Sequence, residues 1–407
     1  MSLRICYLLP RLLPGKSGII VGGCATNCVS LALELRRQGV QIELLAPVPK
    51  ERLEFLSRHS VGEIVRPLPS YGTGLSGKGI SAIQVLRHGL KKRMRETHYD
   101  VVHSHSGTYP YAIVPLAANR KTSVRSHSLY CPIGAKGGAY TSWWEKPIAA
   151  RLIFNKLDRV IAVTENVRQS IERAGVPSEK IESISMCVET RRFYPMDRKE
   201  PSKYFPNRSK GARILFIGNS SKEKGLIELL QAVQILTQKG IPLFLVATIE
   251  NQSEIKEYAS RYDYVKRLVA ELGLAHNVQI LGLIDDIENL YAETDLVVFP
   301  WNTSRGPSDY PMVALEAMAM GKCIVSTPVG GCPELLLGGK AGILTEGFSS
   351  ESLAAALEYA INHPEILRQR GQTALETANN FSVEKNGKRM INLYERLLKG
   401  KVRRNEQ

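Results

Sequence analysis

Residues 308–328 read SDYPMVALEAMAMGKCIVSTP, and they join a helix-forming segment to a strand-forming one. The part that begins at Met312 has the composition of a buried helix, and KCIVSTP follows it as a short apolar run that favours a strand. A helix that leads into a buried strand is the repeating half of a parallel α/β sheet. Glu316 is the one carboxylate in this apolar helix, and a buried carboxylate without a partner is costly.

The same alternation extends in both directions from this stretch. In the second half, RILFIG, IPLFLVAT, NVQILGL, DLVVFP, KCIVSTP and AGILT are predicted strands. In the first half, RICYLL, QIELLAP, DVVHSHS, TSVRSH, RVIAVT and KIESISM are predicted strands, with helical patterns between them. This order predicts an α/β protein with two Rossmann-like, doubly wound parallel-sheet domains facing a central cleft, where ligands bind at the carboxyl ends of the strands.

Changes in composition along the chain set the predicted domain boundaries. Residues 1–195 form the predicted N-terminal domain, and the polar, proline-containing segment 196–212 reads as a linker. Residues 213–381 form the second domain. The tail, 382–407, is a predicted helix that could cross back to the first domain.

The overall composition is that of a globular protein large enough for two domains. The chain has 407 residues and a net charge of +15, and no apolar run reaches the roughly 18–20 residues that span a bilayer. The first residues read as a strand and not as a signal peptide, and the seven cysteines complete no zinc pattern. We therefore expect a reduced, cytoplasmic protein. Its positive charge suits nucleic acid, anionic lipid or phosphorylated ligands, or it serves solubility alone.

One predicted helix, GISAIQVLRHGLKKRMRETH, concentrates part of that charge. Apolar residues recur at helical spacing from Ile80 to Met94, and Arg and Lys residues surround them. A helix of this kind either lies on the cytoplasmic face of an anionic membrane or packs into the core with a solvated basic face. Both readings are open from the sequence.

Two places carry candidate binding chemistry. After the predicted strand that ends at Gly218, Lys222 and Lys224 precede a helix, which makes a plausible anion site or an ordinary exposed loop. Glu316 lies about one turn inside its helix. There it could accept hydrogen bonds from a diol, lie partly exposed, or pair with a lysine.

At this point the sequence resembles a known family. DYPMVALEAMAMGKCIVSTPVGGCPELL resembles the second-domain signature of retaining glycosyltransferases of family 4 (glycosyltransferase group 1), which have the GT-B fold. GNSSKEKG resembles the phosphate loop of that family, LGLIDDIENLYAETDLVVFP its base-binding region, and YDVVHSHS and SVRSHS its two histidine-bearing strands. The resemblance runs from Arg4 to about Leu398.

The resemblance implies a function. The expected reaction is transfer of a sugar, with retention, from a UDP- or GDP-sugar to a glycan, lipid-linked or small-molecule acceptor, as in polysaccharide biosynthesis. It implies no metal and no other cofactor. We also expect no nucleic-acid partner, because the sequence shows no aromatic-rich basic platform and no recognition-helix motif.

The resemblance also assigns roles to individual residues. Glu316 would hold the ribose, Lys224 the diphosphate, and His127 would lie beside the reacting sugar, although His127 taken alone reads as a core histidine. The implied catalytic residues are His127, Lys224 and Glu316. The implied donor-binding residues are Gly22, Gly23, Gly218, Asn219, Lys222, Lys224, Gly282, Leu283, Ser308, Asp309, Met312, Val313 and Glu316.

Two positions depart from the family pattern. Ser308 stands where the first glutamate of the family's pair is expected, with Asp309 beside it, and Asn219 stands where an arginine is usual. The alternative is therefore a catalytically degenerate member that binds a sugar nucleotide or supports a partner. An epimerase or phosphorylase on the same plan is a further alternative. Nucleic-acid binding rests on charge alone.

Overall fold

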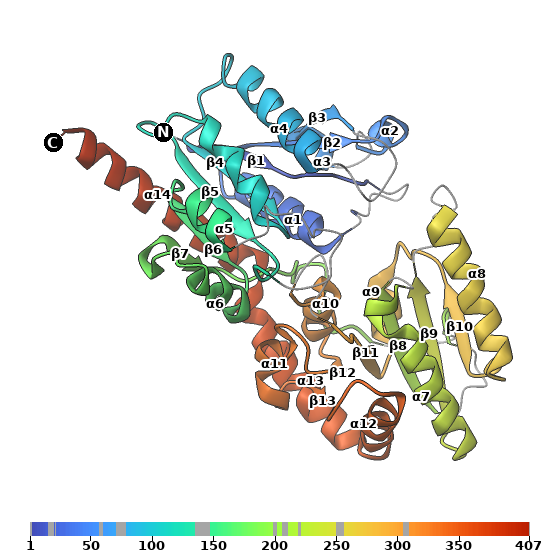
Figure 1. Ribbon diagram of the computed structural model, residues 1–407. Helices are drawn as coiled ribbons and strands as arrows, with labels where there is room; N and C mark the ends of the chain where they lie inside the picture. Colours follow the sequence, from blue (N-terminus) through green and yellow to red (C-terminus); the bar gives the residue numbers. More distant parts are fainter. Residues whose placement is uncertain are drawn as a thin grey trace. The chain divides into compact units, whose positions relative to one another are not determined.

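The computed structural model shows two compact units, each with its own parallel sheet (Figure 1). The first unit comprises Met1–Cys187, Arg305–Asp309 and Phe381–Gln407, and the second comprises Val188–Ser304 and Tyr310–Asn380. The structure describes residues 2–14, 20, 22–56, 60–70, 79–134, 147–197, 202–205, 211–218, 221–249, 256–303 and 309–406.

The described part of the first unit contains a seven-stranded parallel sheet in the order β3-β2-β1-β4-β5-β6-β7. Its strands are β1 (Arg4–Leu8), β2 (Gln41–Val48), β3 (Val65–Pro69), β4 (Val101–Ser106), β5 (Val124–Leu129), β6 (Arg159–Ala162) and β7 (Ile181–Ser183). Its helices are α1 (Gly23–Arg37), α2 (Leu53–Leu56), α3 (Val61–Ile64), α4 (Gly79–Arg93), α5 (Pro147–Phe154), α6 (Glu165–Arg173) and α14 (Val383–Glu406), with 3-10 turns η1 (Lys50–Arg52), η2 (Tyr109–Ile113), η3 (Pro115–Ala117) and η5 (Ser178–Lys180).

The described part of the second unit contains a six-stranded parallel sheet in the order β10-β9-β8-β11-β12-β13. Its strands are β8 (Ala212–Gly218), β9 (Leu243–Ile249), β10 (Val278–Leu281), β11 (Leu296–Phe299), β12 (Cys323–Ser326) and β13 (Ile343–Leu344). Its helices are α7 (Leu226–Gln238), α8 (Lys256–Glu271), α9 (Ile287–Glu293), α10 (Met312–Ala319), α11 (Cys332–Leu335), α12 (Ser350–Asn362) and α13 (Pro364–Ala378), with 3-10 turns η6 (Lys222–Lys224), η7 (Leu337–Gly339) and η8 (Asn379–Phe381).

Both sheets are doubly wound, as the alternating sequence pattern predicted. In each, the first strand lies in the interior and the strand order reverses beside it, between β1 and β4 and between β8 and β11. Ligands of such sheets bind outside the carboxyl ends of the strands at these reversal points. Strand β3 was not predicted, because its prolines at positions 67 and 69 are unusual in a strand. Proline is tolerated here because β3 is an edge strand.

The core of the first unit follows the alternation of side chains along its strands. Ile5 and Tyr7 of β1 face α1 and α14, whereas Cys6 and Leu8 face α4. Tyr394 of α14 is fully buried, and its hydroxyl lies 3.1 Å from that of Tyr7. The tail helix therefore contributes to the core of the first unit and runs along α1 (Figure 1).

The boundary between the two units lies at Cys187/Val188, eight residues before the predicted end of the first domain. Residues 188–195 group with the second unit because Arg192 forms an ion pair with Glu288 and Phe193 packs edge-on against Tyr291.

Helix α4 resolves one alternative left open by the sequence. Leu86 and Leu90 are buried against β1, β2 and β4, with Ile83 packed beside them, while Arg87 and Lys91 are exposed. The apolar face of α4 is thus part of the core, and its basic face is solvated. Among the described residues, no helix is both long and apolar enough to cross a membrane.

Candidate functional site

The strand reversal in the second unit brings two loops together. Turn η6 (Lys222–Lys224) follows β8, and residues 300–302 follow β11. Asn302 connects them, because its side-chain amide donates to the Lys222 carbonyl at 2.8 Å and its backbone N–H donates to the Glu223 carbonyl at 3.3 Å. Gly218 ends β8, directly before this loop. The predicted anion loop therefore lies at the place in the sheet where doubly wound folds bind ligands.

Trp301 holds one of the predicted site residues in position. The Lys224 ammonium lies 3.2 Å from the centre of the Trp301 ring, in cation–π geometry, and Trp301 itself is buried. The Thr327 hydroxyl donates to the Trp301 carbonyl, which ties the backbone of Trp301 to the residue that follows β12. Trp301 was not among the predicted site residues. Its position directly after DLVVFP, at the carboxyl end of a predicted strand, could have indicated it as a site residue.

Glycine is required at position 225, where η6 turns into α7. Its φ is +67°, a left-handed conformation that side chains disfavour. A Cβ atom there would lie 1.7 Å from the Pro300 carbonyl oxygen, which is far inside van der Waals contact. The absence of a side chain thus permits the close approach that places Lys224 over Trp301.

Helix α10 presents a narrow accessible face. Val313 and Glu316, three residues apart, are half-buried, and the other residues of the helix are buried. Pro311 precedes the helix and supplies no side-chain cap. The first N–H groups of a helix lack partners within it, so those of Met312 and Val313 are available to an acceptor at this end.

The surroundings of Glu316 bring its titration close to neutral pH. Burial raises the pKa of Glu316 to about 7, and the Arg192 guanidinium and the Tyr291 hydroxyl oppose that rise. The Tyr291 hydroxyl lies 3.2 Å from the Glu316 carboxylate and 3.0 Å from the Val313 carbonyl, so one proton serves two acceptors. A ligand that donates hydrogen bonds would stabilise the ionised carboxylate. Tyr291 and Arg192 come from distant segments, and sequence analysis did not identify them.

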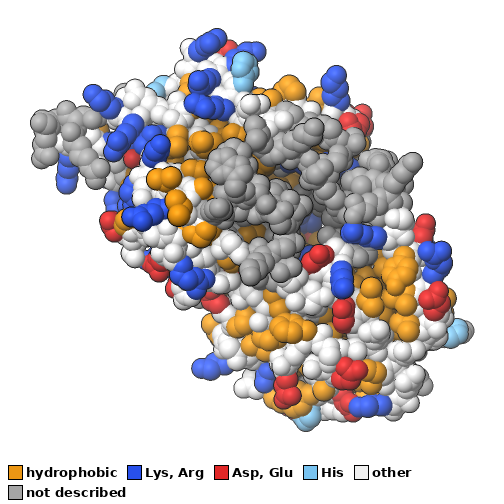
Figure 2. Space-filling view, viewed as in Figure 1, with side chains coloured by type: hydrophobic (Ala, Val, Ile, Leu, Met, Phe, Trp, Pro, Cys, Tyr) orange, Lys and Arg blue, Asp and Glu red, His pale blue; other side chains and the backbone are white. Residues whose placement is uncertain are grey.

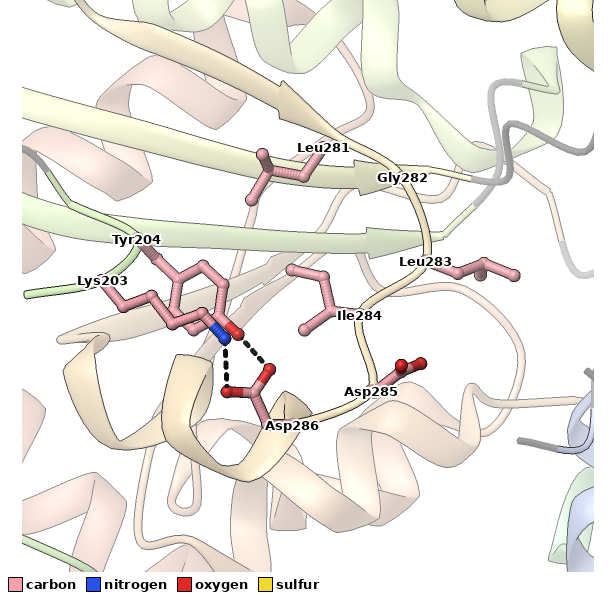
Figure 3. A pocket seen from close by; sticks show the side chains of 8 residues that line it. All are labelled: Lys203, Tyr204, Leu281, Gly282, Leu283, Ile284, Asp285 and Asp286. Carbon is pink, nitrogen blue, oxygen red and sulfur yellow. Dashed lines mark hydrogen bonds and ion pairs between the residues drawn. The ribbon is translucent and has the colours of Figure 1, made fainter. Parts of the chain in front are cut away.

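A pocket of about 620 Å³ is lined by the residues that were predicted to recognise the nucleotide base. Gly282 and Leu283 follow β10, and Tyr204 forms another wall (Figure 3). The side chains of Lys203 and Tyr204 point toward Asp286, whose carboxylate pairs with the Lys203 ammonium at 2.8 Å and accepts from the Tyr204 hydroxyl. These contacts hold Asp286, the residue directly before α9, in place, and Leu283 points away from them (Figure 3).

In the first unit, Gly22 and Gly23 begin α1. Gly22 has a φ of +103°, which only glycine adopts readily, and no side chain caps the helix. The backbone at this end of α1 is therefore bare, and its N–H groups can approach an anion closely. The predicted approach of this backbone to a diphosphate stays a prediction.

His127 lies inside the sheet. It has no exposed surface, its Nδ1 lies 2.7 Å from the Ser104 hydroxyl, and its ring stacks on Phe154. Burial lowers the pKa of His127 to about 3, so the ring is neutral, and Nε2 is buried without a hydrogen-bond partner in the structure. These contacts match a core histidine.

His103 and His105 belong to β4 and lie on the face of the sheet opposite to His127. Both side chains are fully buried in the core. His103 bonds to the hydroxyls of Tyr394 and Ser128, and His105 bonds to that of Tyr130. Their two rings stack 4.2 Å apart.

Asp309 is fully buried in the first unit. Its two carboxylate oxygens accept from the Thr164 hydroxyl at 2.6 Å and from the Asn166 amide at 2.9 Å, and its N–H donates to the Tyr130 carbonyl at 2.8 Å. Asp309 is thus held beside the residue that follows β5 and beside the start of α6. The two departures from the family pattern, Asn219 and Ser308, lie outside the described residues.

No group of three or more metal-ligating side chains is arranged for a metal ion among the residues that the structure covers.

Comparison with known families matches almost the whole chain in two parts. Residues 21–192 match the model of Glycosyltransferase Family 4, and residues 197–377 match the model of Glycosyl transferases group 1.

Curated relatives and solved structures agree with these matches. D-inositol 3-phosphate glycosyltransferase of Rhodococcus opacus is 24% identical over 92% of this chain and 85% of its own length, and that of Catenulispora acidiphila is 26% identical over 93% and 92%. Sucrose-phosphate synthase of Thermosynechococcus elongatus superposes with a TM-score of 0.81 at 17% identity, over 98% of this chain and 100% of that one. Anabaena HepE in complex with UDP-glucose gives 0.72 at 19% identity, over 97% and 100%.

Proposed function

Because the chain belongs to the group 1 glycosyltransferases and has the GT-B fold, we propose that it transfers a sugar from a UDP- or GDP-sugar with retention at the anomeric carbon. The observation that carries the proposal is the carboxyl edge of the second sheet. There Lys224 lies over Trp301, and the pKa of Glu316 is about 7. UDP is the first nucleotide to test, because the similar Anabaena protein is known in complex with UDP-glucose.

The proposed donor contacts divide by chemistry. The charge of the departing diphosphate would be stabilised by three groups of contacts. These are the side chains of Lys222 and Lys224, the loop from Gly218 to Asn219, and the N–H groups of Met312 and Val313. Gly22 and Gly23 would add backbone contacts from the first unit.

The remaining proposed contacts concern the nucleoside and the sugar. The main chain at Gly282 and Leu283 would recognise the base, and Glu316 would accept from the ribose hydroxyls. Ser308 would face the sugar. Asp309 would reach it only by giving up its contacts to Thr164 and Asn166, so we assign Asp309 the role of anchoring the loop. The role of His127 beside the sugar rests on the family resemblance.

The acceptor is proposed to be a glycan, a lipid-linked sugar or a small molecule, in the cytoplasm or at the cytoplasmic face of a membrane. The similarity to D-inositol 3-phosphate glycosyltransferases makes that compound a natural member of the acceptor panel.

Thermal stabilisation by UDP, GDP and ADP, and by their common sugar conjugates, tests the donor site. A ligand that binds only the folded protein raises its apparent stability. We expect the melting temperature to rise with the nucleotides of one base, and we expect this rise to disappear in Glu316→Ala. No rise with any of them, in well-folded protein, would contradict the proposal. NMR of the transferred sugar's anomeric proton then reports retention or inversion.

A second candidate is a degenerate member that binds the donor without transferring the sugar, or that supports a partner transferase. Ser308 and Asn219 favour it, since each replaces a charged residue of the family pattern. Hydrolysis of a bound UDP-sugar in the absence of acceptor separates the two candidates. A protein that is stabilised by the donor yet never cleaves it, alone or with the acceptor panel, is the degenerate binder.

Replacing Trp301 by leucine is expected to weaken UDP binding by about fivefold to tenfold, because a cation–π contact of this kind is worth about 1 kcal/mol or more and positions the Lys224 ammonium. Trp301→Phe keeps an aromatic face and should retain most of the affinity. Calorimetric titration with UDP and with uridine makes the measurement. Because uridine has no phosphate, its affinity should change little. An equal loss for both ligands would assign Trp301 a merely structural role.

A further inference from the structure

The first unit carries an exposed apolar face on α5. Ala150 and Phe154 are buried on one side of this helix, and Phe154 packs edge-on against Tyr109 of η2. On the other side, the side chains of Ile148 and Leu152 are 71% and 63% exposed, more than any other large apolar side chain in the described residues. They lie one helical turn apart, so they project from the same face.

A groove of about 540 Å³ borders this face. Leu152 lies on its edge, and Ile113 and Leu116 of the η2–η3 segment continue the apolar lining, with Ile113 36% exposed. The charged residues that line the groove are all basic: Arg87, Arg120, Arg125 and Lys156.

The positive charge around the groove is only partly neutralised. Asp158 lies two residues after Lys156 in the chain, but it already pairs with Lys401 at 2.8 Å and approaches Arg125 at 3.6 Å. Burial lowers the pKa of Lys180, and the nearby Arg120, Arg125 and Arg159 lower it further against the opposing effect of Asp158.

The exposed basic face of α4 continues this surface. Arg87 lines the groove, and Lys91 follows one turn later along the same helix. Figure 2 shows the result in its upper left, where Lys and Arg side chains ring exposed apolar side chains over the first unit.

We propose that this surface, formed by Ile148, Leu152, Ile113, Arg87, Arg120 and Lys156, docks the protein onto a bilayer that contains anionic lipid. Aliphatic side chains enter the region between headgroups and acyl chains, while surrounding Lys and Arg contact lipid phosphates. The surface differs from the one that the sequence suggested, because α5 and the η2–η3 segment supply the apolar residues and α4 supplies only charge.

Two other partners fit the surface less well. Single-stranded nucleic acid is bound by stacking of bases on aromatic side chains, whereas the exposed residues at the centre of this surface are Ile and Leu. Protein interfaces are anchored mainly by Trp, Tyr and Arg in closed pockets, whereas Ile148 and Leu152 project outward.

Flotation with vesicles tests the proposal on the full chain. We expect binding to vesicles of phosphatidylcholine with phosphatidylglycerol, little binding to phosphatidylcholine alone, and a decrease as salt rises. The double variant Ile148→Glu/Leu152→Glu should lower the partition coefficient at least ~10-fold, since each inserted side chain contributes about that factor. Arg87→Glu/Arg120→Glu should lower it to a similar extent and flatten the salt dependence.

Matched variants in the second unit serve as controls. Phe348→Glu removes a 47% exposed apolar side chain, and Lys340→Glu reverses an exposed charge, and neither should change flotation. Equal melting temperatures and equal stabilisation by UDP would show that the two double variants remain folded. Unchanged flotation of both double variants would overturn the proposal, and so would no binding to anionic vesicles at low salt. Binding to single-stranded RNA that these variants abolish, without binding to vesicles, would assign the surface to nucleic acid instead.

Discussion

Replacing Glu316 by glutamine is expected to weaken UDP binding by about 100-fold, because each hydrogen bond from a ribose hydroxyl to a carboxylate is worth roughly 1.5–3 kcal/mol. Glutamine keeps the size of the side chain, but it loses the charge and one of the two acceptor oxygens. Calorimetric titration at about pH 8 measures the change. Glu365→Gln, at an exposed position in the first turn of α13, is the control and should bind as the wild type does.

The raised pKa of Glu316 adds a dependence on pH. The proposed donor contact needs the ionised Glu316 carboxylate, and burial raises the pKa of Glu316 in the free protein to about 7. Below that pH the ligand must displace a proton, so wild-type affinity should fall roughly tenfold between about pH 8 and about pH 6. Glu316→Gln has no proton to lose at this position, so its affinity should lack that step.

Tyr291→Phe tests the cause of this dependence. The Tyr291 hydroxyl donates toward the Glu316 carboxylate and favours its ionised form. Without that hydroxyl the pKa of Glu316 should rise, and the fall in affinity should move to higher pH. A pH profile that is identical in wild type, Tyr291→Phe and Glu316→Gln would contradict the placement of Glu316 at the ribose.

The predicted strands of the second sheet are all present because each is a short apolar run with a polar or glycine boundary, and such runs are buried in parallel sheets. Strand β3 was missed because Pro67 and Pro69 are rare in strands, and only its edge position permits them. The start of α10 at Met312 agrees with the sequence because proline, here Pro311, is tolerated at the start of a helix and not in its interior.

Contacts between distant segments could not be read from the sequence. Tyr291 and Arg192 act on Glu316 from positions 25 and 124 residues away, and no local pattern encodes that pairing. Trp301 lay in a predicted loop, but its contact with Lys224 depends on how β8 and β11 pair. His127 shows the opposite limit, since the family resemblance predicts a role at the sugar whereas the local pattern predicts a core histidine. The ring is fully buried in this structure, and its role at the sugar stays a prediction.

Gly225→Ala should have the largest effect on stability. Alanine in the left-handed region costs about 1–2 kcal/mol by itself. At position 225 the added Cβ would also meet the Pro300 carbonyl oxygen at 1.7 Å, and a backbone atom cannot rotate away as a side chain does. We therefore expect a total loss of more than ~4 kcal/mol, which is exceptional for one methyl group.

Gly240→Ala is the matched control, because it separates the clash from the backbone preference. Gly240 has a φ of +75°, close to the +67° of Gly225, and nothing lies within 4 Å of the Cβ that alanine would add. Thermal and urea unfolding of both variants should show a small loss for Gly240→Ala and a large one for Gly225→Ala. Equal losses would mean that the turn between η6 and α7 yields at little cost. In that case the contact between Lys224 and Trp301 would not depend on the approach of Gly225 to Pro300, and UDP binding by Gly225→Ala would be retained.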